Sequence, residues 1–202
     1  MKLYYSPGAC SLSPHIALRE AGLKFDLEQV DLGTKKTKSG ADYSKVNPKG
    51  YVPALQLDSG QVLTEAAVLA QYIADQKPEA NVMPRAGSPE RYRAQEWLNY
   101  IATEVHKGFS PLFYDTTPDG YKQTVKDTLA KKFAYLDKQL AGKKYLMGDQ
   151  FSVADGYLFT ILGWAPLLKI SLDAYPNVGA YLSRVAARPA VQAALKAEGL
   201  AA

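Results

Sequence analysis

The stretch YYSPGACSLSPHIALRE, residues 4–20, joins the end of a strand to the start of a helix through a tight turn. The Pro7-Gly8 pair marks the turn, because these two residue types adopt the φ angles that tight turns require. Pro14 suits the first turn of a helix, where the missing N–H of proline would have no partner in any case. We therefore predict a strand over residues 2–6 and a helix over about 11–21.

The following residues continue this alternation of strand and helix. FDLEQVDL, residues 25–32, predicts a second strand, and residues 33–50 predict a loop with one helical turn near 43–46. PALQLDSGQVLTE, residues 53–65, predicts a hairpin, because an Asp-Ser-Gly turn separates two short apolar runs. A helix follows from about Glu65. This order predicts a small mixed sheet that carries helices.

The remainder of the chain reads as helical. Residues 77–89 hold three prolines and a glycine, which is typical of a linker. We predict an α/β domain over residues 1–78, a linker over 79–88 and an all-α domain over 89–202. Expected helix starts are Ser88-Pro89-Glu90, Tyr121, the capping-box-like Ser152-x-x-Asp155, Pro176 and Pro189.

Composition places the chain among reduced, globular proteins. Of its 202 residues 47% are hydrophobic and 22% charged, and the formal net charge is only +4. The lysine pairs are scattered, so we expect no nucleic-acid partner. A single cysteine cannot form an intramolecular disulfide, and no stretch approaches the ~18 apolar residues of a membrane span. We expect a cytoplasmic protein without a membrane anchor.

The single cysteine, Cys10, lies between the predicted first strand and helix. An ordinary thiol has a pKa of about 8.5, and a helix N-terminus typically contributes only ~0.3–1 kcal/mol toward the thiolate. Backbone N–H donors or a nearby cation must therefore add the rest if Cys10 is reactive. The alternative is a small buried thiol that serves only packing.

Two further features suggest a ligand site. Helix starts near Cys10 and at Glu65-Ala66 offer free N–H groups to carboxylates, although Glu65 could simply interact with its own helix dipole. Asn99, Thr103 and His106 share one face of a predicted helix, which could line a cleft or face solvent. The sequence contains no HExxH, CxxC, GxGxxG or P-loop motif, and we expect no metal.

Taken together, several segments resemble the beta-class glutathione S-transferases of bacteria. These are YSPGACSLSPHIALRE, NPKGYVPAL, LTEAAVLAQYIAD, EWLNYIATEVHKGFSPLF and FSVADGYLF, and the resemblance extends from Met1 to residues 197–200. It implies the glutathione transferase fold, with a thioredoxin-like N-terminal domain and an all-α C-terminal domain. It also implies a homodimer with two active sites, and glutathione as co-substrate of a detoxifying enzyme.

The resemblance also implies roles for individual residues. Cys10 and His106 would lie at the glutathione sulfur as catalytic residues. Val52, before a cis Pro53, would pair with the glutathione backbone, although the base rate for X–Pro bonds favours trans. Further glutathione contacts are implied for Lys35, Glu65, Ala66, Asn99, Thr103 and Glu104, with Asn99 and its neighbours reaching across the dimer. Phe109, Phe113 and Trp164 would form the wall for a small hydrophobic electrophile, unless they are plain core residues.

Two chemistries fit such a site. In conjugation, the glutathione thiolate attacks an electrophilic carbon while Cys10 and His106 stabilise it. In thiol–disulfide exchange, the Cys10 thiolate itself attacks a glutathione mixed disulfide. A glutathione-dependent dehalogenase would share the same site, and a non-catalytic protein that binds ligands or partners would share only the fold.

Overall fold

The computed structural model describes residues 1–200 and places a five-stranded sheet in the N-terminal part. β1 pairs in parallel with β2 and antiparallel with β4, and the strand order is β3-β2-β1-β4-β5. The mixed sheet predicted from the sequence is thereby confirmed. The strands are β1 (Lys2–Tyr5), β2 (Asp26–Asp31), β3 (Lys36–Thr37), β4 (Ala54–Gln56) and β5 (Val62–Thr64).

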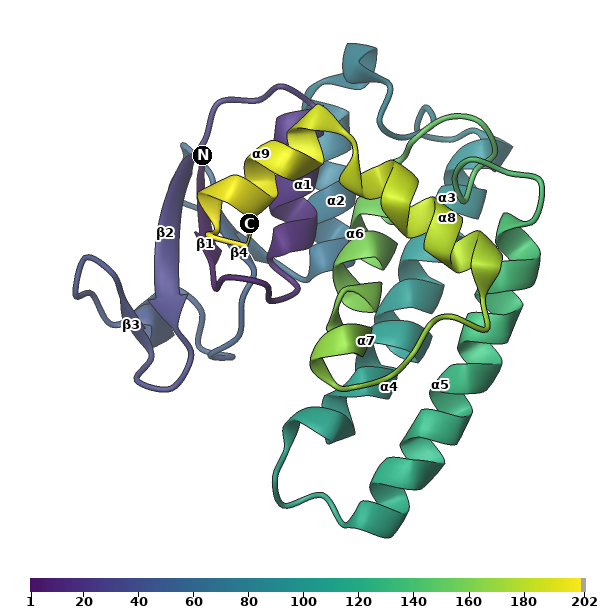
Figure 1. Ribbon diagram of the computed structural model, residues 1–202. Helices are drawn as coiled ribbons and strands as arrows, with labels where there is room; N and C mark the ends of the chain where they lie inside the picture. The colour runs from purple at the N-terminus through teal and green to yellow at the C-terminus, as the bar shows by residue number, and fades with distance from the viewer. Residues whose placement is uncertain (201–202) are drawn as a thin grey trace.

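Helices α1 (Leu12–Glu20) and α2 (Ala66–Gln76) pack side by side next to this sheet (Figure 1). A single 3-10 turn at Tyr43–Lys45 interrupts the long loop, as predicted. The two-residue strand β3 was not predicted, because its surroundings are rich in glycine, lysine and serine, which are typical of loops. The loop that joins β1 to α1 carries Cys10 and turns just below the lower end of α1 in Figure 1.

The C-terminal part is helical, and the five helices whose starts were predicted begin within two residues of those positions. The first of them does not end regularly but widens into a π-helical stretch at Ile101–His106. Such wide turns are rare and are found mostly at functional sites. The helices are α3 (Pro89–Tyr100), α4 (Lys107–Phe109), α5 (Asp119–Leu140), α6 (Val153–Leu162), α7 (Trp164–Leu167), α8 (Pro176–Ala186) and α9 (Pro189–Ala197), with short 3-10 turns at Pro78–Ala80 and Ser110–Phe113.

The start of α6 is fixed by the predicted capping box. The backbone N–H and the hydroxyl of Ser152 both donate to Asp155 Oδ2, each at 2.8 Å. Asp155 is fully buried, and this burial raises its pKa to about 6. The box therefore satisfies the polar groups of a helix start that lies inside the protein core.

A glycine allows α6 to approach α1 closely. A Cβ atom added to Gly156 would lie 3.2 Å from Cγ2 of Ile16, a fully buried side chain of α1. The apolar core is continuous across this contact, since Leu3 and Ile16 belong to the same cluster as Leu158. The two parts of the chain therefore share one core.

The last helix returns to the N-terminal part and packs along α1 (Figure 1). At its start Arg188 forms a paired interaction with Glu20, with N–O distances of 2.6 and 2.8 Å. The guanidinium group also lies 4.2 Å from the centre of the Phe151 ring. These contacts hold the end of the chain against the helix that follows Cys10. None of the helices within residues 1–200 combines the length and the hydropathy needed to cross a membrane.

Candidate functional site

The Cys10 thiol lies two residues before α1 and donates a hydrogen bond to the carbonyl oxygen of Val52, with an S–O distance of 3.2 Å. Burial raises the pKa of this thiol to about 12, although the backbone N–H groups of Cys10 and Ser11 act in the opposite direction. At neutral pH the thiol is therefore protonated and acts as a hydrogen-bond donor. The helix start does not produce the thiolate that exchange chemistry requires.

The peptide bond between Val52 and Pro53 is cis, as the resemblance implied and against the base rate for X–Pro bonds. Two side chains fix Tyr51, the residue before Val52. The Tyr43 hydroxyl and the Asn47 amide both donate to the Tyr51 carbonyl at 2.7 Å. The backbone that carries Val52 is thus held rigidly beside Cys10.

Lys35 also reaches the segment that precedes Val52. Its ammonium group donates to the Gly50 carbonyl at 2.9 Å and lies 6.0 Å from the centre of the Tyr51 ring. Its own backbone lies in the left-handed region, at a φ of 57°. The cation predicted to meet a carboxylate of glutathione therefore stands at the same edge of the site as Val52.

Glu65 and Ala66 form the start of α2, next to the end of β5. Glu65 has a φ of 71°, a conformation that is uncommon for a residue other than glycine. Its carboxylate accepts from the Lys49 ammonium at 2.7 Å, and that same ammonium donates to Thr64 Oγ1 at 3.0 Å. The sequence interpretation missed Lys49, because a lysine in a Pro-Lys-Gly loop resembles any solvated surface charge.

His106 ends the π-helical stretch and faces α6. Its Nδ1 atom lies 2.7 Å from the hydroxyl oxygen of Tyr157, and its ring stands edge-on to Trp164 at 5.1 Å. Burial, with a smaller effect from the Lys107 charge, lowers the pKa of His106 to about 4. The imidazole is therefore neutral at physiological pH.

The three aromatic residues predicted to form an apolar wall do lie together. The centre of the Trp164 ring is 6.0 Å from that of Phe109 and 5.2 Å from that of Phe113. Phe109 is fully buried, whereas Phe113 is half exposed. For Phe109 the alternative of core packing therefore describes its position: it supports Trp164 from behind and offers no surface to a ligand.

Two polar side chains of the π-helical region contact helices of the C-terminal part and not the Cys10 thiol. The Thr103 hydroxyl donates to the Asn99 carbonyl of its own helix at 3.0 Å, and the Glu104 carboxylate pairs with Lys132 of α5 at 2.9 Å. The contacts found within residues 1–200 do not join Asn99, Thr103 or Glu104 to the Cys10 group. Their predicted role at a neighbouring subunit's site stays a prediction.

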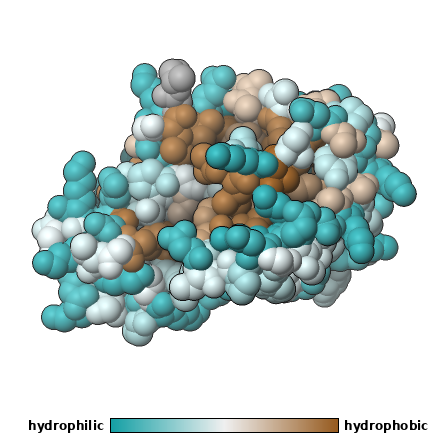
Figure 2. Space-filling model, turned by 60° about the horizontal axis from the view of Figure 1, so that its bottom comes forward, coloured by the Kyte–Doolittle hydropathy of each residue, from teal (hydrophilic) through white to brown (hydrophobic). Residues whose placement is uncertain are grey.

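Charge effects show that the central residues of the site are close together. After burial, the largest charge effects on the pKa of Cys10 are a rise caused by Glu65 and a lowering caused by Lys107. The same two charges act on His106. Figure 2, in which the lower side of Figure 1 comes forward, shows hydrophobic surface gathered around a hollow in the middle of this face.

The turn before Cys10 is held from two sides by residues far away in the sequence. The Trp164 indole N–H donates to the Gly8 carbonyl at 2.8 Å, and the Gly8 N–H donates to Glu198 Oε2 at 3.0 Å. The other carboxylate oxygen of Glu198 lies 2.8 Å from Nδ1 of His15, whose Nε2 accepts from Arg19. We call Gly8, His15 and Glu198 the Gly8 clamp. The Gly8 clamp could not be predicted from local sequence patterns, because Glu198 is more than 180 residues away from both Gly8 and His15 in the sequence.

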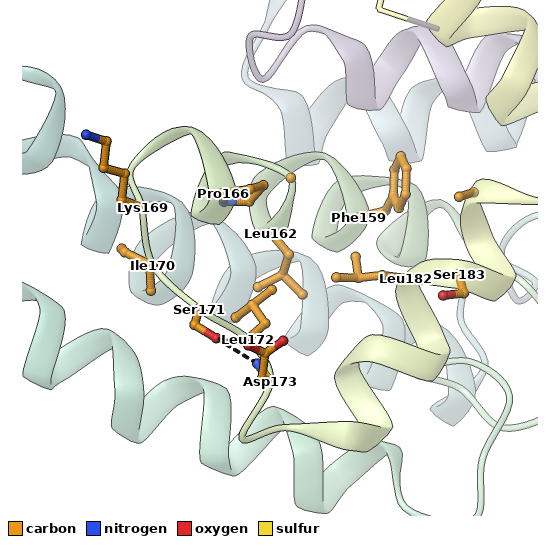
Figure 3. Close-up of a pocket in the computed structure, with 12 residues that line it drawn as sticks. Phe159, Leu162, Pro166, Lys169, Ile170, Ser171, Leu172, Asp173, Leu182 and Ser183 are labelled. Carbon is orange, nitrogen blue, oxygen red and sulfur yellow. Dashed lines mark hydrogen bonds between the residues drawn. The ribbon is translucent and has the colours of Figure 1, made fainter. Parts of the chain in front are cut away.

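A second concavity lies between α6, α7, the loop after α7, and α8 (Figure 3). Its sides carry apolar side chains such as Pro166, Ile170 and Leu182, and Ser171 and Asp173 hydrogen-bond to each other at its rim. None of the predicted site residues lines it. The described residues also hold no group of three or more His, Cys, Asp or Glu side chains arranged for a metal ion.

The chain is similar to known proteins over nearly its full length. Residues 8–76 match the family model of the glutathione S-transferase N-terminal domain, and residues 100–189 match that of the C-terminal domain. The chain is 50% identical to glutathione S-transferase GstA of Escherichia coli O157:H7, over 99% of this chain and 100% of that protein.

Two solved structures share the fold closely. One is the structure of a sphingomonad glutathione S-transferase complexed with glutathione. Its sequence is 51% identical to this chain, the TM-score is 0.96, and the match covers 100% of both chains. The bacterial beta-class glutathione S-transferase of Sphingomonas chungbukensis is 52% identical, with a TM-score of 0.96 over 99% of this chain and 100% of that chain.

Proposed function

The chain belongs to the beta class of bacterial glutathione S-transferases, and from this premise we propose that it conjugates glutathione to small hydrophobic electrophiles at the Cys10 site. It is an enzyme, a glutathione transferase with the thioredoxin-like N-terminal and all-α C-terminal domains of that fold. The roles of individual residues belong to the proposal.

The observation that carries the proposal is the meeting of two ligand-binding features around one thiol. Cys10 contacts the carbonyl of Val52, the residue before cis Pro53. The Glu65 carboxylate at the start of α2 is close enough to affect the pKa of Cys10. A peptide that ends in charged groups can thus pair its backbone with Val52 and place its thiol at Cys10. We assign the γ-glutamyl end to Glu65 and the Ala66 N–H, and the glycine carboxylate to Lys35.

The protonated state of Cys10 favours conjugation over thiol–disulfide exchange. Exchange needs a thiolate on Cys10, and burial raises the pKa of this thiol to about 12. A protonated thiol can instead turn from Val52 and donate a hydrogen bond to the glutathione sulfur. Such a donor stabilises the negative charge of the attacking thiolate. We assign this role to Cys10 together with His106.

The electrophile would lie against Phe113 and Trp164, with Phe109 behind them. Trp164 is also bonded through its indole N–H to Gly8 of the turn before Cys10, at 2.8 Å. The apolar wall and the thiol are therefore parts of one rigid unit. This arrangement holds an apolar electrophile next to a sulfur nucleophile, which is the proximity that a bimolecular reaction needs.

Three broader expectations belong to the same proposal. The enzyme acts as a homodimer, to which Asn99, Thr103 and Glu104 contribute at the neighbouring site. The thioredoxin-like domain covers residues 1–78 and the helical domain residues 89–202, with a linker between them. The compartment is the cytoplasm, where glutathione and free thiols are kept reduced.

The proposal is tested by conjugation kinetics with reduced glutathione and 1-chloro-2,4-dinitrobenzene. We expect Glu65→Gln to raise the KM for glutathione at least tenfold, because a charged hydrogen-bond partner is worth about 1.5–3 kcal/mol. Glu79→Gln is the matched control, since Glu79 is an exposed acid outside the site. No turnover by the unmodified protein, or equal KM values for both variants, would contradict the proposal.

A further inference from the structure

We infer that Tyr157 is a positioning residue for His106: its hydroxyl fixes the imidazole proton on Nε2, so that His106 donates a hydrogen bond to the glutathione sulfur. The inference rests on the proposed function, in which His106 lies beside that sulfur. It assigns a task to Tyr157, a residue for which neither the sequence pattern nor the proposed chemistry gave one.

The contact itself is short and buried. The Tyr157 hydroxyl oxygen lies 2.7 Å from His106 Nδ1, and the two rings stand edge-on at a centroid distance of 5.8 Å. Tyr157 is only 2% exposed. Water therefore has little access to the phenol, and its hydrogen bonds must come from the protein.

The direction of the hydrogen bond follows from the partners that are present. A phenol carries one proton, and a neutral imidazole carries one proton on either nitrogen. Among the hydrogen bonds found within residues 1–200, His106 Nδ1 is the only partner of the Tyr157 hydroxyl. If Nδ1 carried the proton, the phenol proton would be buried without an acceptor, which is costly. The Tyr157 hydroxyl therefore donates to Nδ1, and the imidazole proton resides on Nε2.

The other ring nitrogen is available to a ligand. Nε2 lies on the edge of the ring away from Nδ1 and makes no hydrogen bond within the described residues. Packing against Trp164 at 5.1 Å restricts rotation of the ring. The neutral imidazole thus presents one fixed N–H donor. It stabilises a thiolate that is already ionised and does not remove the thiol proton, because its only basic nitrogen is occupied by Tyr157.

The fold explains how Tyr157 reaches this place. The capping box of Ser152 and Asp155 fixes where α6 begins, and Tyr157 stands in the second turn of that helix. Gly156 lets α6 approach α1, since a Cβ there would lie 3.2 Å from Ile16. Tyr157 is therefore delivered by a rigid, tightly packed element, as a positioning residue requires.

The experiment combines the ¹⁵N spectrum of His106 with the kinetics of Tyr157→Phe, which keeps the ring and removes the hydroxyl. We expect the unmodified enzyme, without glutathione, to show the tautomer protonated on Nε2. In Tyr157→Phe we expect a mixture of tautomers and a fall in kcat of about two- to tenfold, the usual effect of one hydrogen bond. The KM for glutathione should change by less than about twofold, because the peptide contacts remain.

Tyr181→Phe is the matched control. Tyr181 is also a fully buried tyrosine of the helical part, and its hydroxyl donates to the Asp155 carbonyl at 2.9 Å. Loss of this bond is expected to lower stability without changing the His106 tautomer. A proton on Nδ1 in the unmodified enzyme, or an unchanged tautomer together with an unchanged kcat in Tyr157→Phe, would overturn the inference.

Addition of glutathione tests the proposed function separately. We expect the His106 signals to shift when glutathione binds. If glutathione binds without shifting them, His106 is not beside the sulfur and the catalytic part of the inference is overturned. The tautomer seen without glutathione still decides, in that case, whether Tyr157 holds the imidazole proton on Nε2.

Discussion

The carboxylate of Glu198, close to the end of the chain, accepts a hydrogen bond from the backbone N–H of Gly8, two residues before Cys10, at 3.0 Å. The side chain of Glu198 is completely buried and also contacts His15 Nδ1 at 2.8 Å. Arg19 donates to His15 Nε2, so the ring proton must reside on Nδ1 and point at Glu198. Glu198 therefore accepts from two donors, and the C-terminal segment fixes the turn that carries the thiol.

Glu198→Gln tests this clamp. A glutamine replaces one acceptor oxygen by an amide N–H₂, which would face either Gly8 or His15, both of them donors. We expect a loss of about 1–3 kcal/mol in the free energy of unfolding, because a buried donor is left without a partner. Urea unfolding measures the loss, and Glu90→Gln, at an exposed position, serves as control. Equal stability of the two variants would contradict the role of the clamp.

Gly156→Ala tests the close contact of α6 with α1. An alanine Cβ would lie 3.2 Å from the buried Ile16 side chain, so the substitution should destabilise the protein by about 1–3 kcal/mol. Gly179→Ala is the matched control, because Gly179 lies in α8 with no atom near its added Cβ. There we expect a gain of up to about 1 kcal/mol from helix propensity. Similar melting temperatures for both variants would show that α6 and α1 can move apart freely.

The reactivity of Cys10 should be low at neutral pH. Because burial raises the pKa of the thiol to about 12, the rate of alkylation by iodoacetamide should rise about tenfold per pH unit from pH 7 to 9. The measurement follows the mass of the protein, whose single cysteine makes the product unambiguous. A rate that levels off near pH 7 would reveal a thiolate and favour exchange chemistry instead.

His106 should make stability depend on pH. Burial, followed by the Lys107 charge, lowers its pKa from 6.5 to about 4, so the folded state prefers the neutral ring. Above pH 6.5 the His106 side chain is neutral in both the folded and the unfolded protein. As the pH falls, His106 of the unfolded chain gains its proton first. The contribution of His106 to stability is therefore complete above pH 6.5 and is lost between about pH 6.5 and 4.

Unfolding of His106→Gln in urea at several pH values checks this sign. The difference in stability between the unmodified protein and the variant should decrease as the pH falls through that window. Asp155 has a raised pKa of about 6 and acts in the opposite direction, but it is present in both proteins and cancels in the difference. A difference that grows on acidification would mean that the folded state stabilises protonated His106.

Some of the physical signals that determine this structure act only between residues close together in the sequence. Turn and capping residues such as Pro7-Gly8 and Ser152 were sufficient for the strand and helix starts, because they act within a few residues. The resemblance supplied the positions of Cys10, Val52 and Glu65, which the structure brings together. The state of the Cys10 thiol was not predictable, since it depends on burial by distant segments.

The same limit explains the residues that were missed. Tyr157 and Glu198 act on His106 and Gly8 across long separations in the sequence, and neither residue type has a local pattern that announces such a contact. Phe109 and Phe113 were predicted to form one apolar wall with Trp164, with plain core packing as the alternative. Only packing shows that one is fully buried and the other half exposed.

The most direct test of the proposed glutathione site is thermal unfolding with and without reduced glutathione, for the unmodified protein, Cys10→Ala and Glu65→Gln. At about 100 times its dissociation constant, glutathione should stabilise the first two by about 2.7 kcal/mol, because Val52, Lys35 and Glu65 hold the peptide. Glu65→Gln should respond far less. A response that disappears with Cys10→Ala, or that is equal in all three proteins, would contradict the site described above.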